Sequence, residues 1–202
     1  MERTGVLGID VCSAGAQRCA DFLSEHWVDG KCKLKTGVTA NGYQGYGNTL
    51  EEHSPAEQAL NTLLFKPRLL SVARDNVPGF GEIVDDLTAA IKRVLGLDVS
   101  LHSAHGLRQG PATARSSVFG WHQDDEEIKT IHLTACVKLT PDIPNQETSK
   151  MNVAGARETF EYGPQIGSTA IFFSCLKHAS VVPSASDHQR DHLKMTFFFS
   201  LV

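Results

Sequence analysis

A histidine and an aspartate separated by one residue follow a strand-like segment in the second half of the chain. The segment Val118–Trp121 is apolar apart from one glycine, and His122 and Asp124 come directly after it. Side chains two positions apart in an extended chain point to the same face, so these two residues can meet at one point. An imidazole nitrogen and a carboxylate oxygen that meet in this way provide two of the three ligands of a metal-binding face.

A second histidine stands where a later strand could return it to that point. His178 follows the apolar segment Thr169–Phe173, and the interval after His122 leaves room for several strands to run out and back, as a jelly-roll barrel requires. Two histidines and one carboxylate on one face of an octahedron leave the other positions open, which is the arrangement of non-haem Fe(II) oxygenases. The alternative is a structural sandwich in which His122 and His178 never meet.

A cation and a hydroxyl stand two residues apart in the last apolar segment. Lys194 and Thr196 share one face of a predicted strand. A cation beside a hydroxyl, next to a metal, suits the binding of a distal carboxylate. An exposed edge-strand lysine that opposes aggregation is the other interpretation of Lys194, and Arg190 is a second candidate for the anchoring cation.

Length and composition fit one domain covering residues 1–202. The chain is 41% hydrophobic and 21% charged, and its net charge of -4 gives no overall attraction to nucleic acid. No apolar segment approaches the roughly 18–20 residues of a membrane span, and the N-terminus lacks the layout of a signal peptide. We therefore expect no membrane partner and an intracellular location, in the cytoplasm or nucleus. The five cysteines are scattered and indicate neither a disulfide framework nor a zinc site.

Residues 1–98 are predicted to be mainly helical support with loops. Helices are expected from Ser13 to about Trp27, from Ser54 to Pro67 and from about Gly81 to Leu95, because each has a start signal or an apolar stripe at helical spacing. Residues 37–49, rich in glycine, tyrosine and asparagine, are expected to form a long loop, and a short strand is expected at 31–35.

Residues 99–202 change to the alternation that is typical of strands. Thr130–Leu139 alternates cleanly, a loop is expected from Pro141 to Asn152, and further strands are expected at 158–162, 169–173 and 193–201. Helices first and strands afterwards predict an α+β fold, with a sandwich or barrel whose sheet is backed on one face by the N-terminal helices.

The second half resembles the Fe(II)- and 2-oxoglutarate-dependent dioxygenases, whose signature is His-x-Asp, a distal histidine and a later Arg or Lys. His122, Asp124, His178 and Lys194 match it, and Gly155–Phe160 and Gly167–Phe172 are similar to the strands before the distal histidine. The resemblance implies a double-stranded β-helix (jelly-roll) catalytic core over residues 99–202. It also implies Fe(II) held by the first three residues, and 2-oxoglutarate anchored by Lys194 and Thr196 or by Arg190. The reaction would use O2 and convert 2-oxoglutarate to succinate and carbon dioxide while a substrate C–H bond is hydroxylated or a methyl group is removed.

The tail from His178 to Thr196 is most similar to the TET/JBP and AlkB-type nucleic-acid oxygenases, which implies a modified nucleobase as substrate, such as a methylated base in DNA or RNA. Arg108, Arg115 and Trp121 are then candidates for the substrate rim, because a flipped base needs an aromatic surface and nearby cations. A lysine anchor is used more by prolyl-hydroxylase relatives, so hydroxylation of a protein side chain or a small molecule is the alternative. A further alternative is that the chain is a non-catalytic jelly-roll binding module with a vestigial metal site.

Overall fold

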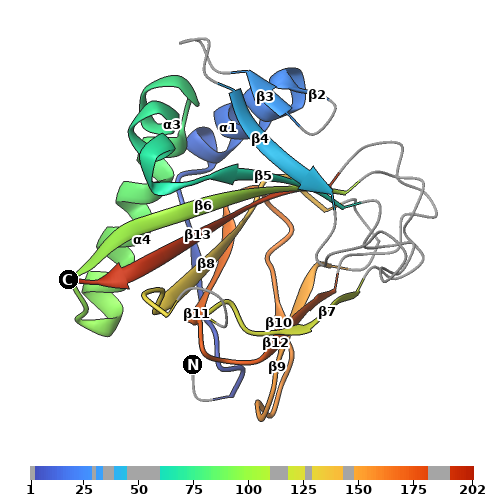
Figure 1. The fold of residues 1–202 in the computed structure, drawn as a ribbon. Coiled ribbons are helices and arrows are strands. Elements are labelled where there is room, and N and C mark those ends of the chain that lie inside the picture. Colours follow the sequence, from blue (N-terminus) through green and yellow to red (C-terminus); the bar gives the residue numbers. More distant parts are fainter. Residues whose placement is uncertain are drawn as a thin grey trace.

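Two antiparallel sheets and a layer of helices make up the computed structural model of the chain, which describes residues 3–28, 31–33, 39–44, 60–109, 118–125, 129–142, 148–181 and 192–202 (Figure 1). Within these residues the larger sheet has the strand order β1-β11-β8-β13-β6-β5-β4-β3-β2. Its strands are β1 (Leu7–Asp10), β2 (Trp27–Val28), β3 (Lys31–Lys33), β4 (Thr39–Gln44), β5 (Leu60–Phe65), β6 (Val99–Gln109), β8 (Leu133–Lys138), β11 (Ser168–Phe173) and β13 (His192–Leu201).

The smaller sheet contains the strand that ends at His122, and Asp124 lies in the turn after that strand. Its order in the described residues is β10-β9-β12-β7, and its strands are β7 (Val118–His122), β9 (Lys150–Val153), β10 (Phe160–Glu161) and β12 (His178–Val181). From β7 to β13 each strand lies in the other sheet from the strand before it, as in a jelly roll, except that β9 and β10 are neighbours in the smaller sheet. The predicted α+β fold with a jelly-roll core is confirmed.

The helices cover one face of the larger sheet. Side chains of α1 (Ser13–His26) and α4 (Phe80–Leu95) form one apolar cluster with alternate residues of the central strand β13, which include Met195, Phe197 and Phe199. These three side chains have no exposed surface. Burial of each such side chain contributes roughly 1.5–3 kcal/mol to folding, so the cluster fixes β13 against the helices and leaves its other face to the second sheet.

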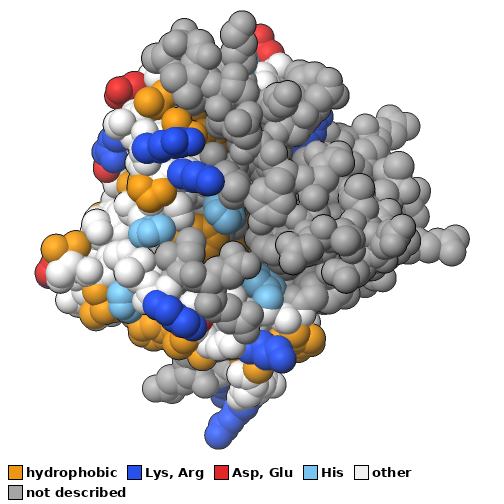
Figure 2. Space-filling model, viewed as in Figure 1, with side chains coloured by type: hydrophobic (Ala, Val, Ile, Leu, Met, Phe, Trp, Pro, Cys, Tyr) orange, Lys and Arg blue, Asp and Glu red, His pale blue; other side chains and the backbone are white. Residues whose placement is uncertain are grey.

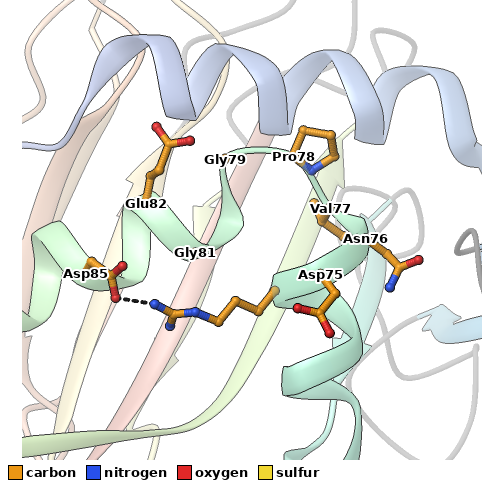
Figure 3. A pocket seen from close by; sticks show the side chains of 9 residues that line it. Asp75, Asn76, Val77, Pro78, Gly79, Gly81, Glu82 and Asp85 are labelled. Atoms are coloured by element: carbon orange, nitrogen blue, oxygen red, sulfur yellow. Dashed lines mark hydrogen bonds and ion pairs between the residues drawn. The ribbon is translucent and has the colours of Figure 1, made fainter.

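Glycines define how the helices meet. Gly79 precedes α4 at φ 83°, and a Cβ there would lie 1.9 Å from the carbonyl oxygen of Gly15 in α1, so the two backbones approach more closely than any side chain permits. The surface pocket beside this contact lies between α3 (Leu70–Asn76) and α4, where Arg74 forms an ion pair with Asp85 (Figure 3). At the other end of α4, Gly96 has φ 70° and its N–H donates to Lys92 O, which ends the helix as predicted.

Residues 1–98 differ from the prediction in several places, because β1, β2 and α3 were not expected and two expected elements have another structure. The helix expected from Ser54 to Pro67 is wrong over Leu60–Phe65, which form β5 between β4 and β6; residues 54–59 lie outside the described part. The loop expected at 37–49 contains β4 at Thr39–Gln44. Short apolar segments fit a helix or a strand, and pairing with the long strand β6 decides here. This half of the chain therefore extends the large sheet as well as supplying helices.

The strands of the second half follow the prediction more closely. β11 and β13 lie where expected, whereas the loop expected at Pro141–Asn152 includes the start of β9, and β10 is shorter than predicted. β8 is buried on both faces: Ala135 and Val137 join the helix-side cluster, and Cys136 joins a second cluster between the sheets. No helix in the described residues is long and apolar enough to cross a membrane.

Candidate metal centre

The two histidines of the motif meet across a pair of strands. β12 pairs antiparallel with β7, and the register places His178 directly opposite His122. Side chains at directly opposed positions point to the same face of a sheet, and the two imidazole rings lie with their centroids 4.3 Å apart. The alternative in which these histidines never meet is therefore wrong.

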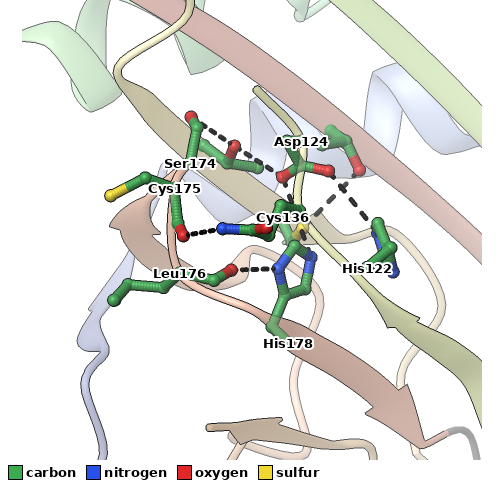
Figure 4. Close-up of polar contacts among 10 residues, drawn as sticks. His122, Asp124, Cys136, Ser174, Cys175, Leu176 and His178 are labelled. Atoms are coloured by element: carbon green, nitrogen blue, oxygen red, sulfur yellow. Dashed lines mark hydrogen bonds and ion pairs between the residues drawn. The ribbon is translucent and has the colours of Figure 1, made fainter. Parts of the chain in front are cut away.

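Asp124 completes the cluster from the turn that follows β7. One of its carboxylate oxygens lies 3.5 Å from His122 Nε2 and the other lies 3.7 Å from His178 Nε2 (Figure 4). A donor atom from each of the three residues lies within 4.8 Å of the other two. That spacing is compatible with three ligands on one face of a single ion.

Neighbouring polar groups hold the carboxylate in place. Thr134 Oγ1 in β8 donates to Asp124 Oδ2 at 2.7 Å, and the Asp124 N–H donates to Ser174 O at 3.1 Å. The Ser174 hydroxyl lies 2.9 Å from Thr134 Oγ1 and must donate to it, because the threonine proton is already used. The larger sheet therefore orients a ligand that the smaller sheet carries.

The distal histidine is oriented in the same manner. His178 Nδ1 lies 3.0 Å from the carbonyl oxygen of Leu176, which can only accept, so Nδ1 carries the proton and Nε2 faces Asp124 with a free lone pair. The ring also packs against Phe172 at 4.4 Å between centroids. A fixed tautomer and a fixed ring plane are typical of histidines that bind metals.

The protonation states of the cluster suit a cation. Burial lowers the pKa of His178, so this imidazole is neutral at pH 7. Burial alone would raise the pKa of Asp124, but the hydrogen bond from His122, the charges of both histidines and the hydrogen bond from Thr134 together lower it. Metal ligands must be deprotonated to bind, and both groups already are. The donor set, two nitrogens and one carboxylate, fits Fe(II).

The inner face of the larger sheet carries Lys194 and Thr196 beside this cluster. Thr196 lies opposite Cys136 of β8, and Lys194 lies opposite Lys138. The two lysines differ: Lys138 forms a buried ion pair with Asp142 and donates to Gly163 O, whereas no carboxylate of the described residues lies within ion-pair distance of Lys194. Burial lowers the pKa of Lys194, because the ammonium group has left water. The charges of Cys136 and Asp124 oppose this shift but do not cancel it.

His105 is a polar residue of the site that the sequence reasoning did not select. It lies in β6 opposite Thr196 of β13, while Cys136 lies opposite the same threonine in β8, the other neighbour of β13. The His105 ring contacts that of Phe198 edge-on, with centroids 4.7 Å apart. Burial lowers its pKa to about 4, and the charge of Asp124 opposes that shift. β6 continues through His105, and the alternation of polar and apolar residues in this strand is the signal that could have found it.

Two of the remaining predicted residues lie within the described part of the chain, and both are outside the cluster. Trp121 is 51% exposed and precedes His122 on the opposite face of β7, so it lies at the rim. Arg108 lies opposite Leu193, which faces the helices, and thus on the other face of the sheet from Lys194. Arg115 and Arg190 lie outside the described residues.

Solved structures similar to this chain cover nearly its whole length. A prolyl-4-hydroxylase from Pseudomonas putida is 15% identical, with a TM-score of 0.58, and the match covers 98% of this chain and 92% of that one. A prolyl hydroxylase from Trichoplax adhaerens, in complex with a peptide of hypoxia inducible factor, is 10% identical with a TM-score of 0.61 and coverages of 98% and 84%. The non-haem α-ketoglutarate-dependent epimerase SnoN from nogalamycin biosynthesis is 15% identical with a TM-score of 0.62 and coverages of 98% and 78%.

In sequence, no protein-family model and no curated protein matches the chain. None of the three structures above is a nucleic-acid oxygenase, so they do not show the similarity to TET/JBP and AlkB-type enzymes that the tail suggests. At these identities the likeness shows the fold alone: the chain shares its architecture with these three enzymes.

Proposed function

We propose that the chain is an Fe(II)- and 2-oxoglutarate-dependent oxygenase, with residues 1–202 forming one catalytic domain. The observation that carries this proposal is the convergence of His122, Asp124 and His178 within 4.8 Å, at the place where the two sheets of a jelly roll meet. A vestigial site would have no reason to keep the tautomer of His178 and the carboxylate of Asp124 fixed by neighbouring groups.

His122, Asp124 and His178 would hold the iron. When bound together with 2-oxoglutarate and O2, the iron supplies the oxidative decarboxylation of 2-oxoglutarate to succinate and carbon dioxide, coupled to transfer of one oxygen atom to a substrate C–H bond. The chain itself provides binding and orientation. Thr134 and Leu176 keep two ligands in position, and Phe172 shields the His178 ring from water.

Lys194 and Thr196 would bind the distal carboxylate of 2-oxoglutarate. The ammonium group lacks a carboxylate partner within the described residues, and the Thr196 hydroxyl is buried on the same strand face. In the space-filling view, histidine side chains lie near the middle of the face, and Lys and Arg are more evident around them than Asp and Glu (Figure 2). A cationic surrounding favours an anionic cosubstrate.

For the substrate we propose a C–H bond of a protein side chain, such as a prolyl ring, or of a small molecule. The net charge of -4 and the lysine anchor favour this class over a nucleic acid. A modified nucleobase is the second candidate, and the exposed indole of Trp121 next to His122 is the observation that favours it.

Mass spectrometry distinguishes these substrates. The protein is incubated with Fe(II), 2-oxoglutarate and, in separate reactions, prolyl peptides, small-molecule extracts and methylated oligonucleotides. Gain of one oxygen atom identifies hydroxylation, and loss of a methyl group identifies demethylation. The product should disappear in Asp124→Ala and persist in Thr159→Ala, whose side chain hydrogen-bonds to Asn152 on the surface. Product formation by Asp124→Ala would contradict the proposed metal site.

A further inference from the structure

A tight turn joins β11 to β12 and is fixed to the larger sheet. It comprises residues 174–176, and the Leu176 N–H closes it by donating to Phe173 O at 3.0 Å. The Ser174 N–H donates to the carbonyl oxygen of His132, the residue before β8, at 3.0 Å. The Ser174 hydroxyl also bonds to Thr134 in β8. The 174–176 turn is therefore held in place beside the metal centre.

Three consecutive carbonyl groups of the 174–176 turn accept hydrogen bonds from the metal centre (Figure 4). The pairs are the Asp124 N–H to Ser174 O at 3.1 Å, Gln123 Nε2 to Cys175 O at 2.5 Å and His178 Nδ1 to Leu176 O at 3.0 Å. Two of these donors belong to the metal ligands themselves. The third is the side-chain amide of Gln123, the residue between the two ligands of the His-x-Asp motif.

Gln123 gives the motif a second point of contact with the turn. One hydrogen bond, from the Asp124 N–H to Ser174 O, fixes a distance but leaves the segment free to pivot about it. A second bond, from the neighbouring residue to the neighbouring carbonyl, removes that rotation. β7 ends at His122, so the segment after it depends on the turn for its orientation.

The contact of Gln123 depends on its side chain. Any residue at this position would leave the Asp124 N–H in place, but the bond to Cys175 O requires a donor at the end of a side chain of this length. The His-x-Asp pattern does not prescribe the residue between the ligands, so the pattern alone gave no reason to select Gln123.

We propose that Gln123 is a positioning residue of the metal centre. It acts with the Asp124 N–H to hold the segment from His122 to Asp124 against the 174–176 turn before the metal binds. The same turn orients His178, so all three ligands are placed relative to one support. A site whose ligands are already oriented loses little affinity to their ordering. This inference rests on the proposed function, because it assumes a metal ion at these ligands.

The test compares two glutamine variants of the full chain in a calorimetric titration with Mn(II). Gln123→Met keeps an unbranched side chain of similar length and removes the amide. Gln165→Met is the matched control, because it removes an amide that donates to Asp10 Oδ1 at 2.9 Å before the other end of β11. We expect Gln123→Met to bind Mn(II) about 2- to 10-fold more weakly, the range for one hydrogen bond between uncharged groups. Gln165→Met should bind like the wild type.

Amide hydrogen exchange, followed by NMR on the metal-free protein, separates positioning from a purely structural role. The Asp124 N–H should exchange faster in Gln123→Met than in the wild type, because its bond to Ser174 O opens more often. The His132 N–H, which donates to Phe199 O at 2.8 Å, should exchange at the wild-type rate in both variants. A purely structural hydrogen bond would lower the unfolding temperature when removed and leave the Mn(II) affinity of the folded protein unchanged.

The outcomes are distinct. Wild-type Mn(II) affinity in a folded Gln123→Met protein, or an equal loss in Gln165→Met, overturns the role of Gln123 and leaves the proposed function standing. Exchange of the Asp124 N–H at the wild-type rate in Gln123→Met does the same. A wild-type protein that binds no Mn(II) overturns the metal centre, and with it the proposed function itself.

Discussion

Replacing Thr134 by valine tests whether the larger sheet prepares the metal centre. Valine has nearly the shape of threonine, and Thr134 is fully buried, so the change removes a buried hydroxyl and its hydrogen bonds while keeping a similar side-chain volume. The lost interaction is the 2.7 Å hydrogen bond to Asp124 Oδ2, and Ser174 loses its acceptor as well. The carboxylate of Asp124 is then free to turn away from the histidines.

The expected size of the effect follows from the charge on the acceptor. A hydrogen bond to a charged group contributes about 1.5–3 kcal/mol, and each 1.4 kcal/mol changes a binding constant about tenfold. We therefore expect Thr134→Val to bind Mn(II) or Fe(II) about 10- to 100-fold more weakly, in the range that is usual for groups that orient metal ligands. The pKa of Asp124 should also rise, because one of the interactions that lower it is lost.

Anaerobic calorimetric titration with the metal measures this affinity, and circular dichroism verifies that the fold is kept. Thr134→Ser retains the hydroxyl and should recover most of the affinity. Thr159→Val, at an exposed position far from the centre in sequence, should bind like the wild type. Unchanged metal affinity in a folded Thr134→Val protein would refute the reasoning, since the hydrogen bond would then contribute nothing to the site.

Three further predictions follow from the described residues. Burial lowers the pKa of His105 from 6.5 to about 4, so between these pH values the unfolded chain binds a proton that the folded chain does not. The free energy of unfolding of the metal-free protein should therefore decrease as the pH falls through that range. In urea unfolding measured at a series of pH values, His105→Gln should make this decrease smaller. Gly79→Ala should lower the free energy of unfolding by about 3 kcal/mol or more, whereas Gly96→Ala, which has a similar φ but open space around it, should cost only about 1–2 kcal/mol. Lys194→Met should abolish measurable 2-oxoglutarate binding while Mn(II) binding persists, and Lys150→Met, which removes an exposed ion pair with Glu161, should change neither.

The ligand cluster could be predicted because local rules place its members. The period of two in extended chain puts His122 and Asp124 on one side, and the same period puts Lys194 and Thr196 on one face of β13. The return of His178 to this point was expected because it follows the apolar segment Thr169–Phe173. That His178 begins a further strand, β12, and stands in register with His122 depends on long-range pairing, which the structure supplies.

Other parts depend on contacts between distant segments. Leu60–Phe65 reads equally well as helix or strand, and its place beside β6 decides the outcome. Arg108 was predicted to lie at the substrate rim; its pairing with Leu193 puts it on the helix-facing side instead.

The central claim is that His122, Asp124 and His178 hold an iron ion that turns over 2-oxoglutarate. The most direct measurement is the formation of succinate from 2-oxoglutarate by purified protein with Fe(II) in air, followed by NMR for the wild type, Asp124→Ala and the control His102→Ala, whose ring lies beside Ser103. We predict succinate that depends on Fe(II) for the wild type and His102→Ala, and none above the metal-only background for Asp124→Ala. A wild-type protein that binds both Fe(II) and 2-oxoglutarate but forms no succinate, with or without candidate substrates, would contradict the claim.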